Sequence, residues 1–176
     1  RGRAYQLCIK NANEKGGVLG RRMELIVEDD KSDVATAAKI YEGLITEKRV
    51  DAVLGPYGSP ATDAVADVTE KHGKPLLAPV GTTSIYRKGR RFVFMVVPPA
   101  EAAHEGVVDL AAKRGLKTLA IVGEDSLYAR AVAQGAAELA KRKGLKVVLS
   151  ETYPKGTTDF NALVTRVPGV RARFAR

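Results

Sequence analysis

Cysteine, tryptophan and long apolar runs are scarce in this chain, and each scarcity excludes a class of protein. Among the 176 residues only Cys8 is a cysteine, and there is no tryptophan. One thiol can build neither a disulfide framework nor a cluster of thiolate metal ligands. No apolar run approaches the length of a bilayer-spanning helix. Cys8 shares a helical face with Ala4 and Ala12, so we expect a buried filler rather than a nucleophile.

The sequence signatures of catalysis are missing as well. Neither the dinucleotide-binding Gly-x-Gly-x-x-Gly pattern nor a phosphate-binding loop is present, and the glycines of a nucleophile elbow do not flank Ser59. His72 and His104 fall near the predicted ends of helices, where we expect surface residues. Asp29 and Asp30 lie in a predicted turn, where carboxylates usually cap a helix or stay solvated. We therefore expect no metal, no cofactor and no enzymatic activity.

The chain carries a formal net charge of +9 and a sequence pI near 9.7, a balance that could suit nucleic acid. The basic clusters, however, lie far apart in the sequence and beside glycines: Arg21-Arg22, Arg90-Arg91 and 141–143. At the ends of helices and in turns such residues complement the helix dipole and keep the turn solvated. Aromatic residues do not interleave with the basic ones, and zinc spacing is absent. We expect no nucleic-acid partner.

Predicted strands and helices alternate along the chain, which indicates an α/β fold. The predicted helices cover 4–15, 34–45, 60–72, 107–115 and 126–143, with a further one after 159, and the predicted strands cover 22–28, 51–55, 75–79, 92–97, 118–122 and 146–153. Such an order specifies parallel sheets flanked by helices, because right-handed crossovers place the helices on the faces. Pro98-Pro99 interrupts the series, so we set a boundary between residues 1–98 and 99–176.

Two loops at predicted strand ends are rich in hydroxyls and small residues. The first, 55–60, contains Ser59, and the second, 78–84, contains Thr82. Ligands of open α/β sheets bind beyond the carboxyl ends of the strands, where glycines allow close approach and a helix N-terminus offers free N–H groups. The two loops therefore suit a carboxylate or a phosphate. The alternative is that Ser59 only caps its helix and that residues 82–84 form an ordinary turn.

Several segments, in this order, resemble a known family. They are 13–22, 27–30, 50–56, Ser59, 75–79 and Asp159-Phe160. Together they are similar to the type I periplasmic solute-binding proteins, in particular the branched-chain amino-acid receptors of ABC transporters. The resemblance implies a Venus-flytrap fold of two α/β lobes, with residues 1–98 as a first lobe lacking its first strand and 99–176 as an incomplete second lobe. The chain would then be truncated at both ends.

The same resemblance implies a function and a binding site. Ser59 and Thr82 would hold a ligand carboxylate together with backbone groups of Val80 and Gly81, and Tyr128 would close over it from the second lobe. The ligand would be an amino acid or a related aromatic or aliphatic organic acid, delivered to the membrane permease of an ABC transporter. The protein would be periplasmic, with the signal peptide absent from this chain. The other interpretation of Tyr128 is a residue at the surface or in the core packing of a helix.

Two further functions stay open at this point. The effector-sensing domain of a transcriptional regulator shares the fold, although no DNA-reading helix-turn-helix is visible in the sequence. An enzyme of flavodoxin-like type is the other, weakened by the missing nucleophile and phosphate loop.

Overall fold

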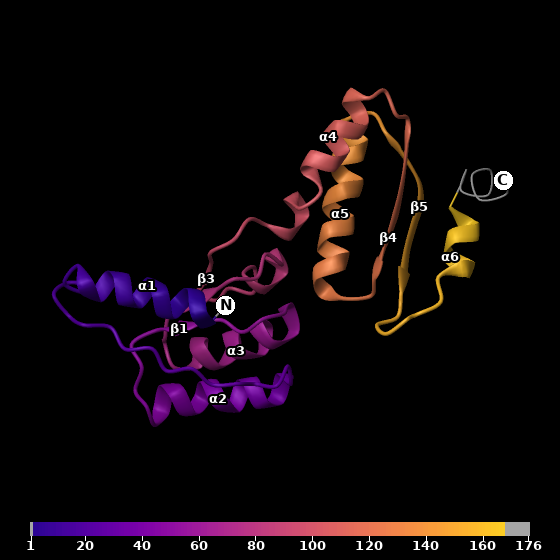
Figure 1. The fold of residues 1–176 in the computed structure, drawn as a ribbon. Coiled ribbons are helices and arrows are strands. Elements are labelled where there is room, and N and C mark those ends of the chain that lie inside the picture. Colours follow the sequence, from indigo (N-terminus) through magenta and orange to yellow (C-terminus); the bar gives the residue numbers. More distant parts are fainter. Residues whose placement is uncertain (1, 168–176) are drawn as a thin grey trace. The chain divides into compact units, whose positions relative to one another are not determined.

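The computed structural model describes residues 2–167, and helices and strands alternate along most of them (Figure 1). The helices are α1 Gly2–Glu14, α2 Val34–Thr46, α3 Ser59–Lys71, α4 Glu105–Lys113, α5 Leu127–Arg142 and α6 Asn161–Arg166. The strands are β1 Val53–Leu54, β2 Leu76–Ala78, β3 Val93–Met95, β4 Thr118–Glu124 and β5 Lys146–Tyr153. Short 3-10 helices, η1 Thr83–Ile85 and η2 Ala100–Ala102, follow β2 and β3. The predicted α/β fold with parallel sheets flanked by helices is confirmed.

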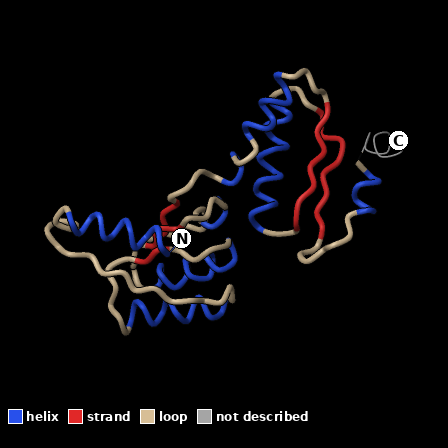
Figure 2. The backbone as a smooth tube through the Cα atoms, in the orientation of Figure 1, coloured by secondary structure: helices blue, strands red, loops and turns tan. Residues whose placement is uncertain are grey.

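The chain divides into two compact units, Arg1–Lys31 and Ser32–Arg176. The first holds α1 and an extended segment that Figure 2 draws as loop. The strand predicted for 22–28 is therefore wrong. Its alternating pattern fits a strand, but a strand forms only where a neighbour accepts its backbone hydrogen bonds. Here the Asn13 side chain takes both backbone groups of Met23, donating to its C=O over 2.8 Å and accepting its N–H over 2.7 Å.

The predicted burial of Cys8 is also wrong. The thiol is exposed, and none of the residues of α1 is buried. A helical apolar stripe places residues on one face of a helix, but burial requires a second surface packed against that face.

The second unit begins with a parallel sheet in the order β1-β2-β3. Val53 pairs with Leu76, and Leu76 pairs with Val93. One face of this sheet packs against α2 and α3 in a continuous core, and its largest fully buried hydrophobic side chains are Leu76, Ile85 and Val65. Such apolar strands flanked by helices are typical of parallel sheets. For comparison below, residues 32–98 are called the first region and residues 99–167 the second region.

The second region contains β4 and β5, which pair in parallel with one irregularity between Leu119 and Ala120. Helices α4 and α5 contribute Val108, Leu139 and Ala140 to a small core that Leu145 completes. The end of the predicted second lobe, 168–176, lies outside the described residues.

Candidate functional site

The two hydroxyl-rich loops meet at one edge of the first sheet. Strands β1 and β2 are parallel neighbours, so their carboxyl ends lie at the same edge. Ser59 follows β1 as the first residue of α3, and Thr82 follows β2. The Oγ of Ser59 lies 2.8 Å from the Oγ1 of Thr82, and the two residues are only 3% and 1% exposed. The sheet topology thus joins side chains 23 positions apart in one buried pair.

Ser59 does not cap its helix. The N-cap of α3 is Gly58, and no side chain makes a capping hydrogen bond there. Gly58 has a φ of 94°, a left-handed conformation that favours glycine and that turns the chain into α3. The alternative in which Ser59 serves only as a cap is therefore wrong, and its hydroxyl is directed to Thr82 instead.

The hydroxyl pair retains an unused donor. A hydroxyl has one proton and two acceptor lone pairs, so one member of the pair donates to the other and the accepting hydroxyl keeps its own proton. Within residues 2–167 this second proton has no acceptor, because the mutual contact is the only hydrogen bond of either side chain. A buried donor without an acceptor costs free energy. The pair is consequently suited to receive an acceptor such as a carboxylate oxygen.

The backbone of the second loop shows the same imbalance. The carbonyl of Gly81 accepts the N–H of Ala100 over 2.7 Å, and the carbonyl of Val80 accepts the hydroxyl of Tyr86 over 2.5 Å. Among the described residues no acceptor contacts the N–H groups of Gly81 and Thr82. The loop therefore has its carbonyls occupied and its N–H donors unused, which is the arrangement an anion requires.

Gly81 is enclosed where it lies. A Cβ added to it would come within 2.4 Å of the carbonyl oxygen of Pro98 and 2.9 Å of the N of Ala100. Val80 and Gly81 are both buried. A side chain at position 81 would therefore push the loop away from the crossover segment that leads to the second region.

The sequence did not reveal the residues that hold this loop in place. Tyr86 donates to the carbonyls of Val80 and, over 3.3 Å, of Ala78, and burial raises the pKa of its hydroxyl. Thr83 donates from its hydroxyl to Glu101 of η2. No motif marks Glu101 in the sequence. For Tyr86 the only signal is an aromatic residue close to a hydroxyl-rich turn.

An ion-pair cluster fastens the chain after η1 to α3. The guanidinium of Arg90 contacts Asp63 at 2.6 Å and Asp67 at 2.5 Å, and it donates to the carbonyl of Ile85 over 3.0 Å. Burial alone would raise the pKa of Asp63, but hydrogen bonds from Lys88 and Arg90 outweigh it and lower that pKa. The side chain of Arg90 is 4% exposed. The solvated turn residue predicted for this position is therefore wrong.

Tyr128 lies at the carboxyl end of β4. It is the second residue of α5, follows the helix cap Ser126 and is 49% exposed. Within the described part of the chain it makes no hydrogen bond to Ser59 or Thr82. Its exposure argues against packing in the core of the second region, and it fits both a residue at the helix surface and a residue that reaches a ligand.

The described residues contain no group of three or more His, Cys, Asp or Glu side chains that could hold a metal ion. None of their helices is both long enough and apolar enough to cross a membrane.

Comparison with known proteins agrees with this architecture. The profile of a periplasmic binding protein family matches residues 2–172, and the chain belongs to that family. A Leu/Ile/Val-binding protein homolog 7 of Brucella abortus (strain 2308) is 30% identical over 92% of this chain. The chain spans 43% of that relative's length.

Solved structures show the same relationship. One of them is the branched-chain amino acid transporter substrate-binding protein LivJ of Streptococcus pneumoniae in complex with isoleucine. It is 29% identical, with a TM-score of 0.76, and the match covers 93% of this chain and 47% of LivJ. A solute-binding protein of an ABC transporter from R. palustris, in complex with 4-hydroxybenzoate, has a TM-score of 0.81, 21% identity and coverage of 96% and 47%. The latter similarity shows the fold alone.

Proposed function

We propose that this protein is the substrate-binding component of an ABC uptake system. It binds an amino acid or a related small organic carboxylate and delivers it to the membrane permease. The observation that carries the proposal is the set of unused donors where β1 and β2 end: the spare hydroxyl proton of the Ser59–Thr82 pair and the N–H groups of the 80–82 loop. These donors are buried, so an incoming carboxylate gains strong charge-assisted hydrogen bonds.

In this mechanism the ligand acts as the missing acceptor. Its carboxylate takes hydrogen bonds from the hydroxyls of Ser59 and Thr82 and from backbone groups of Val80 and Gly81. Residues 1–98 act as one lobe and residues 99–176 belong to the other, from which Tyr128 reaches the ligand. Closure is a shift of population toward the conformation in which both lobes contact the ligand.

The relatives support this class of ligand over the other functions. Among those named above are a Leu/Ile/Val-binding protein homolog and a transporter substrate-binding protein that holds isoleucine, a ligand with a carboxylate. Both are solute-binding proteins by name, a class that fits a transport receptor better than a regulator or an enzyme. The family also supports a periplasmic location. Neither catalysis nor a cofactor is part of the proposal.

Calorimetric titration of the protein expressed from its complete reading frame tests the proposal. The panel is leucine, isoleucine and 4-hydroxybenzoate, together with the amide of leucine, which lacks the carboxylate. We expect at least one acid to bind and leucine amide to bind far more weakly. Ser59→Ala should lower the affinity about tenfold to a hundredfold, because a hydrogen bond to a charged group contributes about 1.5–3 kcal/mol.

Thr69→Val is the matched control for Ser59→Ala. Thr69 is another fully buried hydroxyl of α3 and bonds only to the carbonyl of Ala66 in its own helix, so its loss should leave ligand affinity unchanged. Tyr128→Phe should weaken binding a few-fold. If no acid in the panel binds, or if Ser59→Ala and Thr69→Val lower affinity equally, the assignment of a carboxylate-binding site to Ser59 and Thr82 is wrong.

A further inference from the structure

Positive charge gathers at the end of the second region where β4 and β5 begin. Both strands are parallel and paired from Thr118 and Lys146 onward, and α4 and α5 each end just before one of them. The amino ends of the strands and the carboxyl ends of the helices therefore share one end of this region. Its cationic residues, here called the basic end, are Lys113, Arg114, Lys117, Lys141, Arg142, Lys143 and Lys146.

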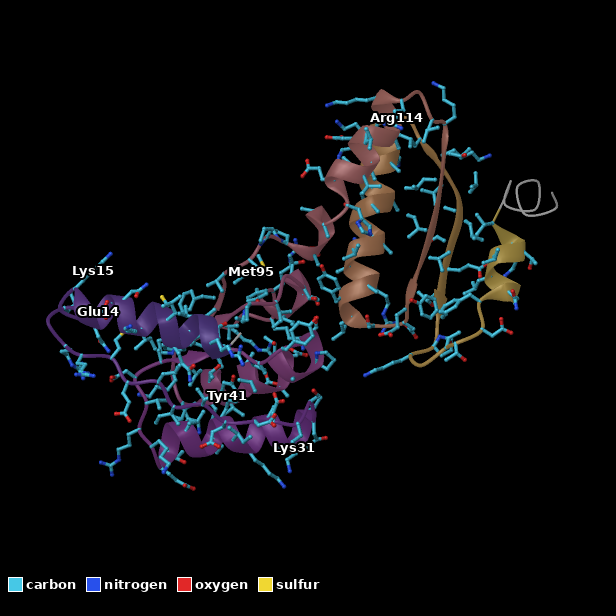
Figure 3. All side chains as sticks on the ribbon, in the orientation of Figure 1. Glu14, Lys15, Lys31, Tyr41, Met95 and Arg114 are labelled. Carbon is cyan, nitrogen blue, oxygen red and sulfur yellow. The ribbon has the colours of Figure 1, made fainter. Side chains whose placement is uncertain are left out.

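Direct contacts support this grouping. The backbone N–H of Lys146 donates to the carbonyl of Lys117 over 2.8 Å. Lys143 of the turn after α5 contacts Asp109 of α4 at 2.8 Å. The pKa of Asp109 is lowered first by its hydrogen bond from Lys143 and also by the charges of Lys143 and Lys113. The cations of segments 113–117 and 141–146 therefore lie at the same end of the second region, where Figure 3 labels Arg114.

The cations of the basic end are exposed and largely uncompensated. All of them are exposed residues. Within residues 2–167 Lys143 is the only one in a direct ion pair, and the charge of Lys113 acts on the same carboxylate, Asp109. The first region is different, because Lys71, Lys88 and Arg90 each contact a carboxylate of their own region. Uncompensated cations at one end create a positive potential that attracts a polyanion.

Helix dipoles explain only some of these residues. Lys113, Lys141 and Arg142 lie in the last turns of their helices, and Arg114 and Lys143 are the C-cap residues, positions where a cation is favourable. Lys117 and Lys146 instead stand at the beginnings of strands, which have little net dipole. Leu116 lies in the chain between α4 and Lys117, and it is 56% exposed. An exposed leucine among cations suits an interface between charged headgroups and acyl chains.

We propose that the basic end docks on the anionic phospholipid surface of a membrane. Lysine and arginine side chains near such a surface add affinity roughly in proportion to their number. The inference rests on the proposed function for one point only, namely that a transport receptor works beside a membrane. A nucleic acid fits less well, because the basic end has no aromatic side chain on which a base could stack.

The test is sedimentation of the complete protein with vesicles of phosphatidylglycerol and phosphatidylcholine, against vesicles of phosphatidylcholine alone. We expect binding only to the anionic vesicles and a strong decrease with added salt. The triple variant R114Q/K117Q/K146Q should bind about a hundredfold more weakly, at about fivefold for each cation. The matched control K39Q/K48Q/R87Q removes the same number and kinds of charge from exposed positions of the first region and should lose only a few-fold.

The outcomes separate this inference from the proposed function. Ligand titration of both triple variants should equal the wild type, since neither touches the carboxylate site. The proposal that the basic end docks on anionic lipid is wrong if the wild type binds both vesicle types equally or binds neither. It is also wrong if the two triple variants lose vesicle binding equally. Retention of the wild type only on membranes that contain the permease would assign the basic end to a protein partner instead. A protein that binds anionic vesicles but no carboxylate would contradict the proposed function and leave the lipid surface standing.

Discussion

The first and second regions use the same alternation of strands and helices, yet they bury it very differently. In the first region three strands, two helices and η1 share one core in which Leu76 and Val65 are fully enclosed. In the second region two strands and two helices share a core of four buried residues. Two strands are a marginal sheet on their own. The longer strands β4 and β5 thus enclose a smaller core than the three short paired strands of the first region.

The two regions also differ in how their charged side chains are paired. Charged side chains of the first region pair across segments, as Arg90 does with Asp63 and Asp67, whereas those of the basic end mostly face solvent. The first region therefore combines a rigid frame with a buried polar site. The second region offers exposed surface for contact.

The largest expected effect is in the two cores. Leu76→Ala should destabilise the first region by about 2–5 kcal/mol, because it removes a fully buried side chain and leaves a cavity. Leu139→Ala should cost less, near the lower end of that range, since its smaller core collapses more readily. Hydrogen exchange under denaturant, resolved for the two regions, measures both values. Equal losses would show that the two cores are equivalent.

A smaller effect is expected from the ion-pair cluster. Arg90→Met should lower the free energy of unfolding of the first region by about 1–3 kcal/mol, because Asp63, Asp67 and the carbonyl of Ile85 lose hydrogen bonds to a charged donor. Lys143→Met, which breaks the partly exposed pair with Asp109, should cost less, about 1 kcal/mol. Chemical denaturation of the two variants measures this difference. A cost for Lys143→Met as large as that for Arg90→Met would remove the contrast between the regions.

The smallest effect is expected from mild acid. The pKa of Glu70 is lowered by hydrogen bonds from the backbone N–H groups of Arg91 and Phe92, and that of Glu42 by hydrogen bonds from Lys71 and His72. A carboxyl whose pKa is lower in the folded than in the unfolded state stabilises the fold fully above the unfolded value of 4.5. That contribution disappears as the pH falls through the folded pKa.

The first region should therefore lose protection from hydrogen exchange as the pH falls below 4.5, and it should lose more than the second, where Asp109 is the carboxyl with a lowered pKa. Glu70→Gln should flatten the pH dependence of the first region. A steeper loss of protection in the second region would contradict this assignment.

Much of the fold could be predicted because its signals are local. Strands such as β2 and β5 are short apolar or alternating runs bounded by proline or glycine, and the polar turn with Asp33 predicted the start of α2, whose first-turn N–H it accepts. The strand at 22–28 could not be judged in this way. Its alternation is local, but its pairing depends on a neighbouring backbone, and the side chain of Asn13 takes that role for Met23.

The candidate site likewise has some features that local sequence predicts and others that only the fold reveals. Loop composition predicted hydroxyls and small residues at two strand ends, and the family resemblance pointed to Ser59, Val80, Gly81, Thr82 and Tyr128. Composition could not predict that Tyr86 and Glu101 would hold the second loop. Nor could it predict that Gly81 would lie against Pro98.

Apart from the strand at 22–28, the sequence by itself determined the order of strands and helices and the hydroxyls at the two strand ends, because backbone preference and hydrophobic pattern act over a few neighbouring residues. Only the tertiary structure decided that Ser59 bonds Thr82 rather than its own helix, that Arg90 is buried, and that cations scattered in the sequence gather at one end of the second region. Each of these depends on segments brought together by parallel pairing and helix packing, and a contact across such distances leaves no signal in local composition.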